Sequence, residues 1–256
     1  MEYAICFVPN NPLRVDHDEC SEMLTELLFG EACTVTESWG NWSKIINKAE
    51  GYVGWVTTKM LTEVSKEYFD AYEPAEQRVL TTLFSQAVSE TTGEKMLLTG
   101  GSLLPEYKED GTFRVKNDRF RINPADAQPL TESLLDTALR FLNTPYQKRK
   151  KNAMGMDCSG LTQVVMRMHG IHILRNASHQ VTQGELVSFL SDAQPGDLAF
   201  FDHADGKISH VGMVAEKGYI IHCSGSVHID KLDDQGIFSK DLNKYTHDLR
   251  LIKRYK

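Results

Sequence analysis

One cysteine stands where its thiol could act as a nucleophile. Cys158 follows Asp157 and precedes a run whose apolar residues recur at the spacing of one buried helical face and which ends at Gly170. The first turn of a helix offers unpaired backbone N–H groups and the positive end of the helix dipole, and both favour an anion. We therefore predict that Cys158 lies in the first turn of a helix and that its thiolate is available near neutral pH. The alternative is a small buried apolar residue without chemistry.

A cysteine nucleophile needs a base, and two histidines lie in strand-like segments further along the chain. Three short apolar segments with turn residues between them predict an antiparallel meander. The segments and turns are 198–201, Asp205-Gly206, 208–214, Lys217-Gly218 and 219–223. His210 lies in the second segment and His222 in the third. The imidazole of His210 can take the thiol proton, and His222 can make the hydrogen bond that fixes the tautomer of His210.

Four blocks in this order resemble the NlpC-type family of bacterial cell-wall cysteine peptidases. They are Asp157-Cys158-Ser159-Gly160, Pro195-Gly196-Asp197-Leu198, Ser209-His210-Val211-Gly212 and Ile221-His222. The resemblance extends from about Thr131 to the C-terminus. It implies a papain-like α+β domain that hydrolyses the bond between γ-D-glutamate and a diamino acid in peptidoglycan stem peptides. It also implies Cys158 as the nucleophile, His210 as the base and His222 as the third polar residue, with no metal or other cofactor.

The same resemblance implies the residues of a substrate cleft. Tyr146, Asp157, Ser159 and Ser178 are expected to contact the D-glutamyl part and the backbone of the stem peptide. Asp157 and Ser159 could instead cap the helix, and the two roles are compatible. Many family members carry a glycine-rich turn after the tyrosine, whereas this chain has Gln-Lys-Arg-Lys-Lys-Asn at 147–152. The shape of that cleft wall is therefore not predicted.

The first part of the chain has the pattern of a small barrel. Short strands are predicted at the N-terminus and at 31–36, 42–46 and 52–57, with a helix or long loop at 18–29. The segments around Trp42 and Trp55 resemble bacterial SH3-like domains. Both tryptophans are expected in the core or groove of that barrel rather than on a nucleic-acid stacking platform. These patterns predict an SH3-like domain at 1–65.

The middle of the chain is less regular. A helix is predicted at 74–88, followed by four short strands. The strands are expected at 95–98, 101–105, 112–115 and 119–122. We predict a second, degenerate SH3-like domain at 66–128, and the alternative is a linker subdomain of no fixed class. A polar stretch with two prolines marks the boundary before a helix that opens at Thr131, and the catalytic domain is expected at 129–256.

The predicted architecture resembles the subgroup that recycles murein peptides inside the cell. In that subgroup the first SH3-like domain closes the cleft, so that only a peptide with a free N-terminal L-alanine fits. An amine in such a cleft requires a carboxylate and an aromatic or hydroxyl neighbour, and Glu31 and Tyr52 are the candidates. The alternative for Glu31 is a solvated loop charge. The expected fold class is α+β, a papain-like domain preceded by one or two small all-β SH3-like barrels.

Composition excludes other classes of function. The net charge of -7 argues against a nucleic-acid partner, and the short run Lys148–Lys151 is expected in a solvated loop. No apolar stretch approaches the length that spans a bilayer, so no membrane contact is expected. The five cysteines are scattered, and the N-terminus lacks the pattern of a signal peptide. A cytoplasmic location is therefore expected, or a periplasmic or secreted one if an export signal has been removed.

Other functions remain open at this point. A zinc site could be drawn from a set of histidines and one cysteine, although the spacing matches no structural zinc motif. The set is His203, His210, His222, Cys223 and His228. Neighbours on a strand such as His222 and Cys223 point to opposite faces. The further alternatives are a secreted wall hydrolase, an amidase or acyltransferase with the same triad, and a wall-peptide binding module. The diamino acid, diaminopimelate or lysine, is not predicted.

Overall fold

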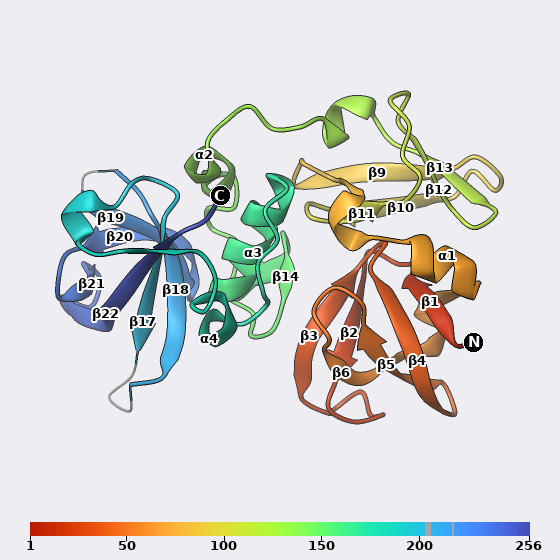
Figure 1. Cartoon of the computed structure of the whole chain (residues 1–256), viewed down its shortest axis with the longest axis horizontal. Coiled ribbons are helices and arrows are strands. Elements are labelled where there is room, and N and C mark those ends of the chain that lie inside the picture. Colours follow the sequence, from red (N-terminus) through yellow and green to blue (C-terminus); the bar gives the residue numbers. More distant parts are fainter. Residues whose placement is uncertain (203–205, 217) are drawn as a thin grey trace. The chain divides into compact units, whose positions relative to one another are not determined.

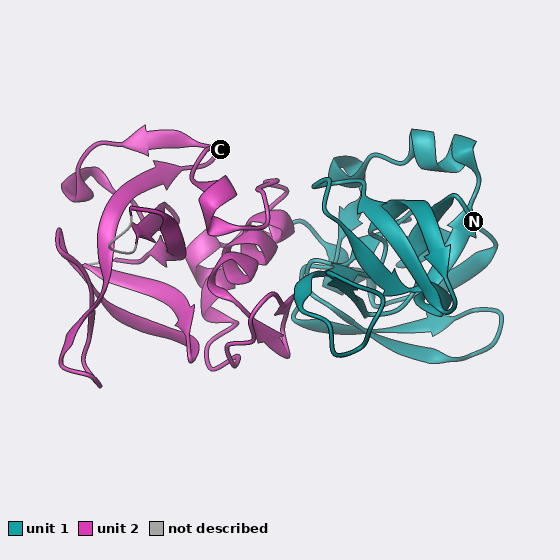
Figure 2. Ribbon diagram, turned by 90° about the horizontal axis from the view of Figure 1, so that it is seen from below, with its two compact units in different colours: residues 1–129 teal, residues 130–256 magenta. Residues whose placement is uncertain are grey.

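The chain forms two compact units, residues 1–129 and residues 130–256 (Figure 2). The computed structural model describes residues 1–202, 206–216 and 218–256. His203 and one residue of each predicted turn, Asp205-Gly206 and Lys217-Gly218, lie outside these ranges. Within the described residues, no helix combines the length and the apolar character that a membrane span requires.

The first half of unit 1 is a seven-stranded antiparallel sheet in the order β3-β2-β6-β5-β4-β1-β7 (Figure 1). Its strands are β1 Tyr3–Cys6, β2 Asn10–Arg14, β3 Met23–Leu28, β4 Ala32–Trp39, β5 Trp42–Asn47, β6 Val53–Thr57 and β7 Leu61–Val64. Alternate side chains, among them Leu13, Ile45 and Val56, form one buried cluster. The predicted strands are confirmed. The prediction of a helix within 18–29 is wrong, because Met23–Leu28 pairs with β2 and so forms a strand.

The second half of unit 1 contains a four-stranded sheet in the order β10-β9-β13-β12. It also contains a two-stranded sheet formed by β8 and β11. Its elements are α1 Lys66–Ala71, β8 Arg78–Val79, β9 Phe84–Ser89, β10 Lys95–Thr99, β11 Leu103–Leu104, β12 Thr112–Val115 and β13 Asp118–Arg121. The predicted helix at 74–88 is wrong. The helical part of this stretch is a single turn, Pro74–Glu76. Arg78–Val79 pairs with β11, and the residues from Phe84 onward pair with β10 and β13.

One hydrophobic cluster joins the two halves of unit 1. It contains Ile5 and Phe29 from the first sheet together with Phe113 and Phe120 from the second. The rings of Phe29 and Phe113 meet edge to face, with their centroids 5.8 Å apart. The two sheets therefore share a core across residue 65, where the sequence predicts a domain boundary. That boundary stays a prediction.

Unit 2 combines three helices with a second seven-stranded sheet in the order β16-β22-β17-β18-β19-β20-β21 (Figure 1). The helices are α2 Leu134–Leu139, α3 Cys158–Met168 and α4 Ala177–Gln180. The strands are β14 Lys151–Asn152, β15 Gly155–Met156, β16 Glu185–Val187, β17 Leu198–Asp202, β18 Ile208–Val214, β19 Tyr219–Ser224, β20 Ser226–Leu232, β21 Gly236–Ser239 and β22 Lys244–Arg254. Unit 2 also has a 3-10 turn at η4 Leu190–Asp192, and unit 1 has such turns at η1 Thr58–Met60, η2 Pro74–Glu76 and η3 Pro124–Ala127. The predicted meander is confirmed, because β17, β18 and β19 pair antiparallel in sequence order.

Helix α3 is the buried centre of unit 2. All of its residues are buried, and it packs against β18, β14 and α2. Its first turn lies so close to the preceding loop that a Cβ atom on Gly160 would be 2.4 Å from the carbonyl oxygen of Lys150. Only glycine fits this contact.

Helix α2 is shorter than predicted, since it begins after Ser133, whose side chain and that of Asp136 form a reciprocal cap. The expected α+β class, with a β-rich N-terminal part, is confirmed.

Candidate active site

Cys158 is the first residue of α3, as predicted, and its side chain is nearly buried, at 8% exposure. Asp157 is the N-cap residue, and its Oδ1 accepts a hydrogen bond from the backbone N–H of Gly160 at 2.7 Å. The helix therefore begins immediately before the thiol. The sequence expectation that Asp157 caps this helix is confirmed by this contact.

A buried arginine holds the start of α3 in place. Arg175 is fully buried and donates to both carboxylate oxygens of Asp157, at 2.8 and 2.9 Å. Its Nη1 also donates to Ser159 Oγ at 3.0 Å, and its Nη2 donates to the carbonyl oxygen of Lys150 at 3.1 Å. Such a two-pronged contact fixes orientation as well as distance. The side chains of Asp157 and Ser159 thus support the helix, and their contact with substrate stays a prediction.

Three neighbouring strands carry a chain of hydrogen bonds that leads away from the base. His210 Nε2 and His222 Nδ1 lie 2.9 Å apart, and His222 Nε2 lies 3.3 Å from Asp230 Oδ2. The residues come from β18, β19 and β20, which are adjacent in the sheet. Gly212 faces His222 across the ladder, and a Cβ atom there would approach the Cβ of His222 to 2.9 Å. The glycine makes room for the second histidine.

These contacts determine where the imidazole protons reside. The Asp230 carboxylate can only accept, so His222 carries its proton on Nε2. His222 Nδ1 then accepts from the Nε2–H of His210, which leaves His210 Nδ1 as the nitrogen that can accept a proton. The sequence analysis missed Asp230. Its only sequence signal is an acidic residue on the strand that follows His222, and the pairing partner of that strand is not visible from the sequence.

The charge states of His222 and Asp230 agree with these hydrogen bonds. Burial lowers the pKa of His222, so the ring stays neutral over most of the physiological range. The hydrogen bond from His222 holds the pKa of Asp230 below its usual range, so the carboxylate stays ionised. With His222 neutral and Asp230 ionised, His210 donates to His222 and His222 donates to Asp230, so both hydrogen bonds run toward the carboxylate.

The prediction of a free thiolate near neutral pH is wrong. Burial, followed by the nearby charge of Asp157, raises the pKa of Cys158 to about 12. Backbone N–H groups of Val211 and Ser159 and the charge of Arg175 favour the thiolate but do not outweigh burial. Burial therefore favours the protonated form of Cys158. If the thiol proton passed to a histidine of β18, the strand that packs against α3, the attraction between the two charges would offset part of the desolvation that opposes a lone thiolate.

The thiol opens into a cleft of about 310 Å³ within unit 2. The lining comprises Tyr146, Lys148, Arg149, Asp157, Cys158, Ser159, Asn176, Ala177, Ser178, Ile208 and Ser209. Four predicted substrate residues, Tyr146, Asp157, Ser159 and Ser178, thus lie together with Cys158. Tyr146 is 41% exposed, and burial of the rest of its ring raises its pKa, so the phenol can donate a hydrogen bond at neutral pH.

Arg149 forms part of the cleft wall that the sequence did not predict. Its backbone is left-handed, with φ of 69°, a conformation that glycine adopts without strain. The backbone N–H donates to Asp157 Oδ2 at 2.8 Å, and Nη1 donates to Asn176 Oδ1 at 3.1 Å. The expected solvated loop at Lys148–Lys151 holds only in part, because Lys148 is exposed in a turn whereas Arg149 lines the cleft and Lys151 is only 1% exposed.

The remaining candidates belong to the other unit. Glu31 and Tyr52 belong to unit 1, and their contact with substrate stays a prediction. Glu31 is 2% exposed, which argues against a solvated loop charge. The sequence analysis also missed His247 on β22, whose ring stacks on that of His210 at 4.0 Å between centroids. This ring covers one face of the base.

The zinc set drawn from the sequence does not assemble among the described residues. Cys223 is buried, and its thiol donates to the carbonyl oxygen of Met156 at 3.2 Å. His203 lies outside the described ranges. The described histidines and acidic residues that do gather are His222, His228 and Asp230.

A cysteine at a helix N-terminus, a histidine on a neighbouring strand and a third residue behind that histidine define the class of papain-like cysteine peptidases. The comparisons agree. Residues 143–246 match the model of the NlpC/P60 family, and residues 13–61 match the bacterial dipeptidyl-peptidase Sh3 domain.

Two relatives share most of their length with this chain. The γ-D-glutamyl-L-lysine dipeptidyl-peptidase of Bacillus cereus is 30% identical, in an alignment that covers 84% of this chain and 72% of the relative. The enzyme of the same name from Bacillus subtilis is 30% identical, with coverages of 82% and 77%. A crystal structure of an NlpC/P60 family protein from Bacillus cereus has the same fold, with a TM-score of 0.83, 23% identity and 99% coverage of both chains. This chain belongs to the NlpC/P60 family of cysteine peptidases.

Replacement of Arg175 by methionine tests the support of the helix start. Arg175→Met leaves the buried carboxylate of Asp157 without its partner, so the free energy of unfolding should fall by about 3–5 kcal/mol. Urea unfolding measures this loss. The matched control is Arg114→Met, which breaks the surface pair with Glu106 and should cost less than about 1 kcal/mol. Equal losses in the two variants would contradict the structural role of Arg175.

Replacement of Asp230 by asparagine tests the hydrogen-bond chain. The amide of Asp230→Asn can donate to His222 Nε2 and so reverse the tautomers of both histidines. We expect kcat to fall roughly 10–100-fold with KM little changed, because the residue orients the base and lies outside the substrate cleft. Steady-state kinetics of peptide hydrolysis measure both constants. An unchanged kcat, or a loss confined to KM, would show that Asp230 does not set the tautomer of His210.

Proposed function

We propose that this protein hydrolyses the bond between γ-D-glutamate and a diamino acid in free peptidoglycan stem peptides that begin with L-alanine. The observation that carries this proposal is the composition of the cleft, where Cys158 lies beside two cationic side chains, Lys148 and Arg149, and several hydroxyl groups. The names of the Bacillus relatives support the γ-D-glutamyl bond and the release of a dipeptide.

The cations match a specific property of the substrate. In a γ-linked D-glutamate the α-carboxylate stays free and lies a few bonds from the carbonyl that is attacked. An ordinary α-linked peptide carries no charge at that position. A guanidinium beside the thiol binds such a carboxylate through two parallel hydrogen bonds. Arg149 supplies it, and Ser178 and Tyr146 line the same cleft.

The reaction uses the groups already described. His210 Nδ1 takes the proton of Cys158 as the sulfur attacks the γ-carbonyl carbon. Backbone N–H groups at the start of α3 stabilise the oxyanion. Collapse of the tetrahedral intermediate expels the amine of the diamino acid, which receives its proton from the imidazolium. A water molecule, activated by the same imidazole, then hydrolyses the thioester and releases the L-Ala-D-Glu dipeptide.

We also propose that this reaction takes place in the cytoplasm, as part of the recycling of murein peptides. All five cysteines are free, and one of them, Cys20, is exposed. Free thiols of this number are typical of a reducing compartment. A free stem peptide, rather than intact cell wall, is the form of the substrate that would be present there.

A panel of four peptides tests the proposed substrate. L-Ala-γ-D-Glu-L-Lys and L-Ala-γ-D-Glu-diaminopimelate are each compared with the same peptide acetylated at the alanine amine, and products are identified by mass spectrometry. We expect L-Ala-D-Glu from the free peptides only, and no product with Cys158→Ala, which should keep its fold. Equal cleavage of the acetylated peptides would contradict the requirement for a free amine. The ratio of the two free peptides gives the preferred diamino acid.

A second prediction concerns Arg149. Arg149→Gly removes the guanidinium while glycine accepts the left-handed backbone, so the loop should keep its shape. The wild-type protein should cleave L-Ala-γ-D-Glu-L-Lys about tenfold better than the matched peptide with D-isoglutamine, whose α-carboxamide is neutral. The variant should cleave the two peptides equally. If the wild-type preference for the carboxylate survived in Arg149→Gly, another group would bind it.

A further inference from the structure

His228 presents an unusual arrangement of hydrogen-bond partners beside the active site. Its Nδ1 lies 2.8 Å from the carbonyl oxygen of Ser226. A carbonyl oxygen can only accept, so Nδ1 carries the proton and Nε2 of the neutral ring has a lone pair. This Nε2 lies 3.2 Å from Asp230 Oδ2, which is also an acceptor. Two acceptors at this distance need a cation between them, either a proton or a metal ion.

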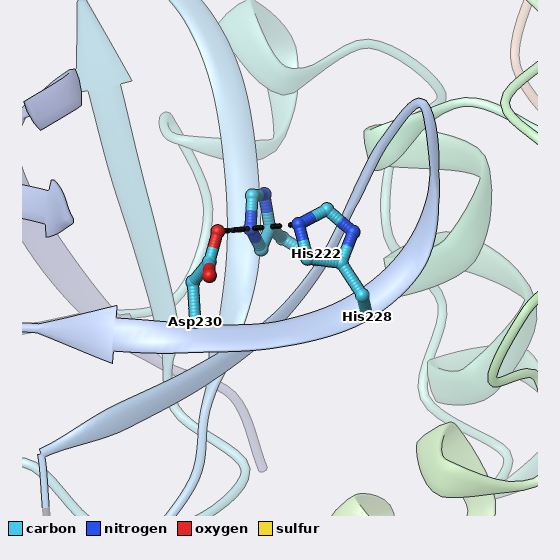
Figure 3. A group of neighbouring side chains, drawn as sticks. All are labelled: His222, His228 and Asp230. Carbon is cyan, nitrogen blue, oxygen red and sulfur yellow. Dashed lines mark hydrogen bonds and ion pairs between the residues drawn. The ribbon is translucent and has the colours of Figure 1, made fainter. Parts of the chain in front are cut away.

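The third group at this point is the Nε2 of His222. It lies 3.3 Å from the same oxygen of Asp230, and the three ligand atoms all lie within 4.8 Å of one another (Figure 3). In a tetrahedral zinc site with bonds of about 2.0–2.1 Å, the ligand atoms are about 3.3 Å apart. Two of the three separations therefore already have the length of a tetrahedral edge. His228 and Asp230 extend from the same strand, β20, and His222 from its neighbour.

The surroundings also suit a metal ion. A metal-binding histidine usually donates its other N–H to a backbone carbonyl, which is the contact that His228 makes with Ser226. The side chain of His228 is 35% exposed, whereas those of Asp230 and His222 are 11% and 1% exposed. An ion can therefore enter from solvent beside His228 and reach the buried nitrogen of His222.

We propose that His222, His228 and Asp230 form an inhibitory site for a divalent transition-metal ion such as Zn²⁺. Imidazole and carboxylate ligands suit this class of ion, and a water molecule completes the tetrahedron. The site differs from the thiol and the base, which supply none of its ligands.

Inhibition follows from the tautomers. A metal ion on His222 Nε2 uses the lone pair of that nitrogen, so the neutral ring must carry its proton on Nδ1. This Nδ1–H donates to His210 Nε2, which then has to accept. The proton of His210 moves to Nδ1, the nitrogen that must take the proton of Cys158. The ion thus reverses the hydrogen-bond chain and leaves the base without a lone pair for the thiol.

Binding is measured by titration calorimetry with ZnCl₂ in a Cys158→Ala background, because this removes the thiol as a competing ligand. We expect the Cys158→Ala protein to bind Zn²⁺ and the double variant Cys158→Ala/His228→Gln to bind at least about tenfold more weakly, since even the loss of an outer partner costs that much. Cys158→Ala/His179→Gln is the matched control, because His179 is an exposed histidine of the same unit, and its affinity should not change. Cys158→Ala/Asp230→Asn provides a second ligand variant.

Inhibition is measured on peptide hydrolysis with the thiol present. Zn²⁺ should lower kcat of the wild-type protein, and a chelator should restore it. His228→Gln should keep the basal kcat and resist Zn²⁺ at least about tenfold better. Equal inhibition of wild type and His228→Gln would place the ion on Cys158 and His210 and overturn the proposal. So would equal affinities of the His228→Gln and His179→Gln proteins. The binding measurement does not depend on which peptide is the substrate.

Discussion

The buried ion pair between Arg175 and Asp157 is the contact on which the catalytic centre depends. It fixes the N-cap of α3, the hydroxyl of Ser159 and the carbonyl of Lys150 in one arrangement. Burying two charges costs free energy, and this cost is offset only when every donor and acceptor finds a partner. Here the guanidinium makes four hydrogen bonds, and Asp157 also accepts from Gly160 and Arg149. The position of the sulfur is thus determined by a polar network rather than by apolar packing alone.

Much of unit 2 could be predicted from the sequence because its signals are local. The spacing of apolar residues after Cys158 identified α3, and short apolar segments between turns identified β17, β18 and β19. The resemblance to known cell-wall peptidases added the grouping of Cys158, His210 and His222. The glycines in the matching blocks have a packing reason, since Gly160 lies against Lys150 and Gly212 against His222.

What the sequence could not predict depends on contacts between distant residues. The segment 74–88 has residues that suit a helix, but its last part, from Phe84, pairs with β10 and β13 and therefore forms a strand. Asp230 and His247 reach the histidines through the order and register of the strands. Lys151 is buried although lysine is seldom buried. The pKa of Cys158 was mispredicted for the same reason, because the helix terminus is a local signal and burial is not.

The resting thiol has a consequence for the chemical durability of the protein. Oxidants and alkylating agents react with thiolates, and a thiol whose pKa is raised by burial presents very little thiolate to them. The sulfur becomes reactive only when His210 takes its proton, and the ion pair so formed is used up by attack on a bound carbonyl. While it is protonated, the nucleophile is in a form that reacts slowly with such reagents. Selective inhibitors would have to resemble the peptide closely enough to be attacked in the same step.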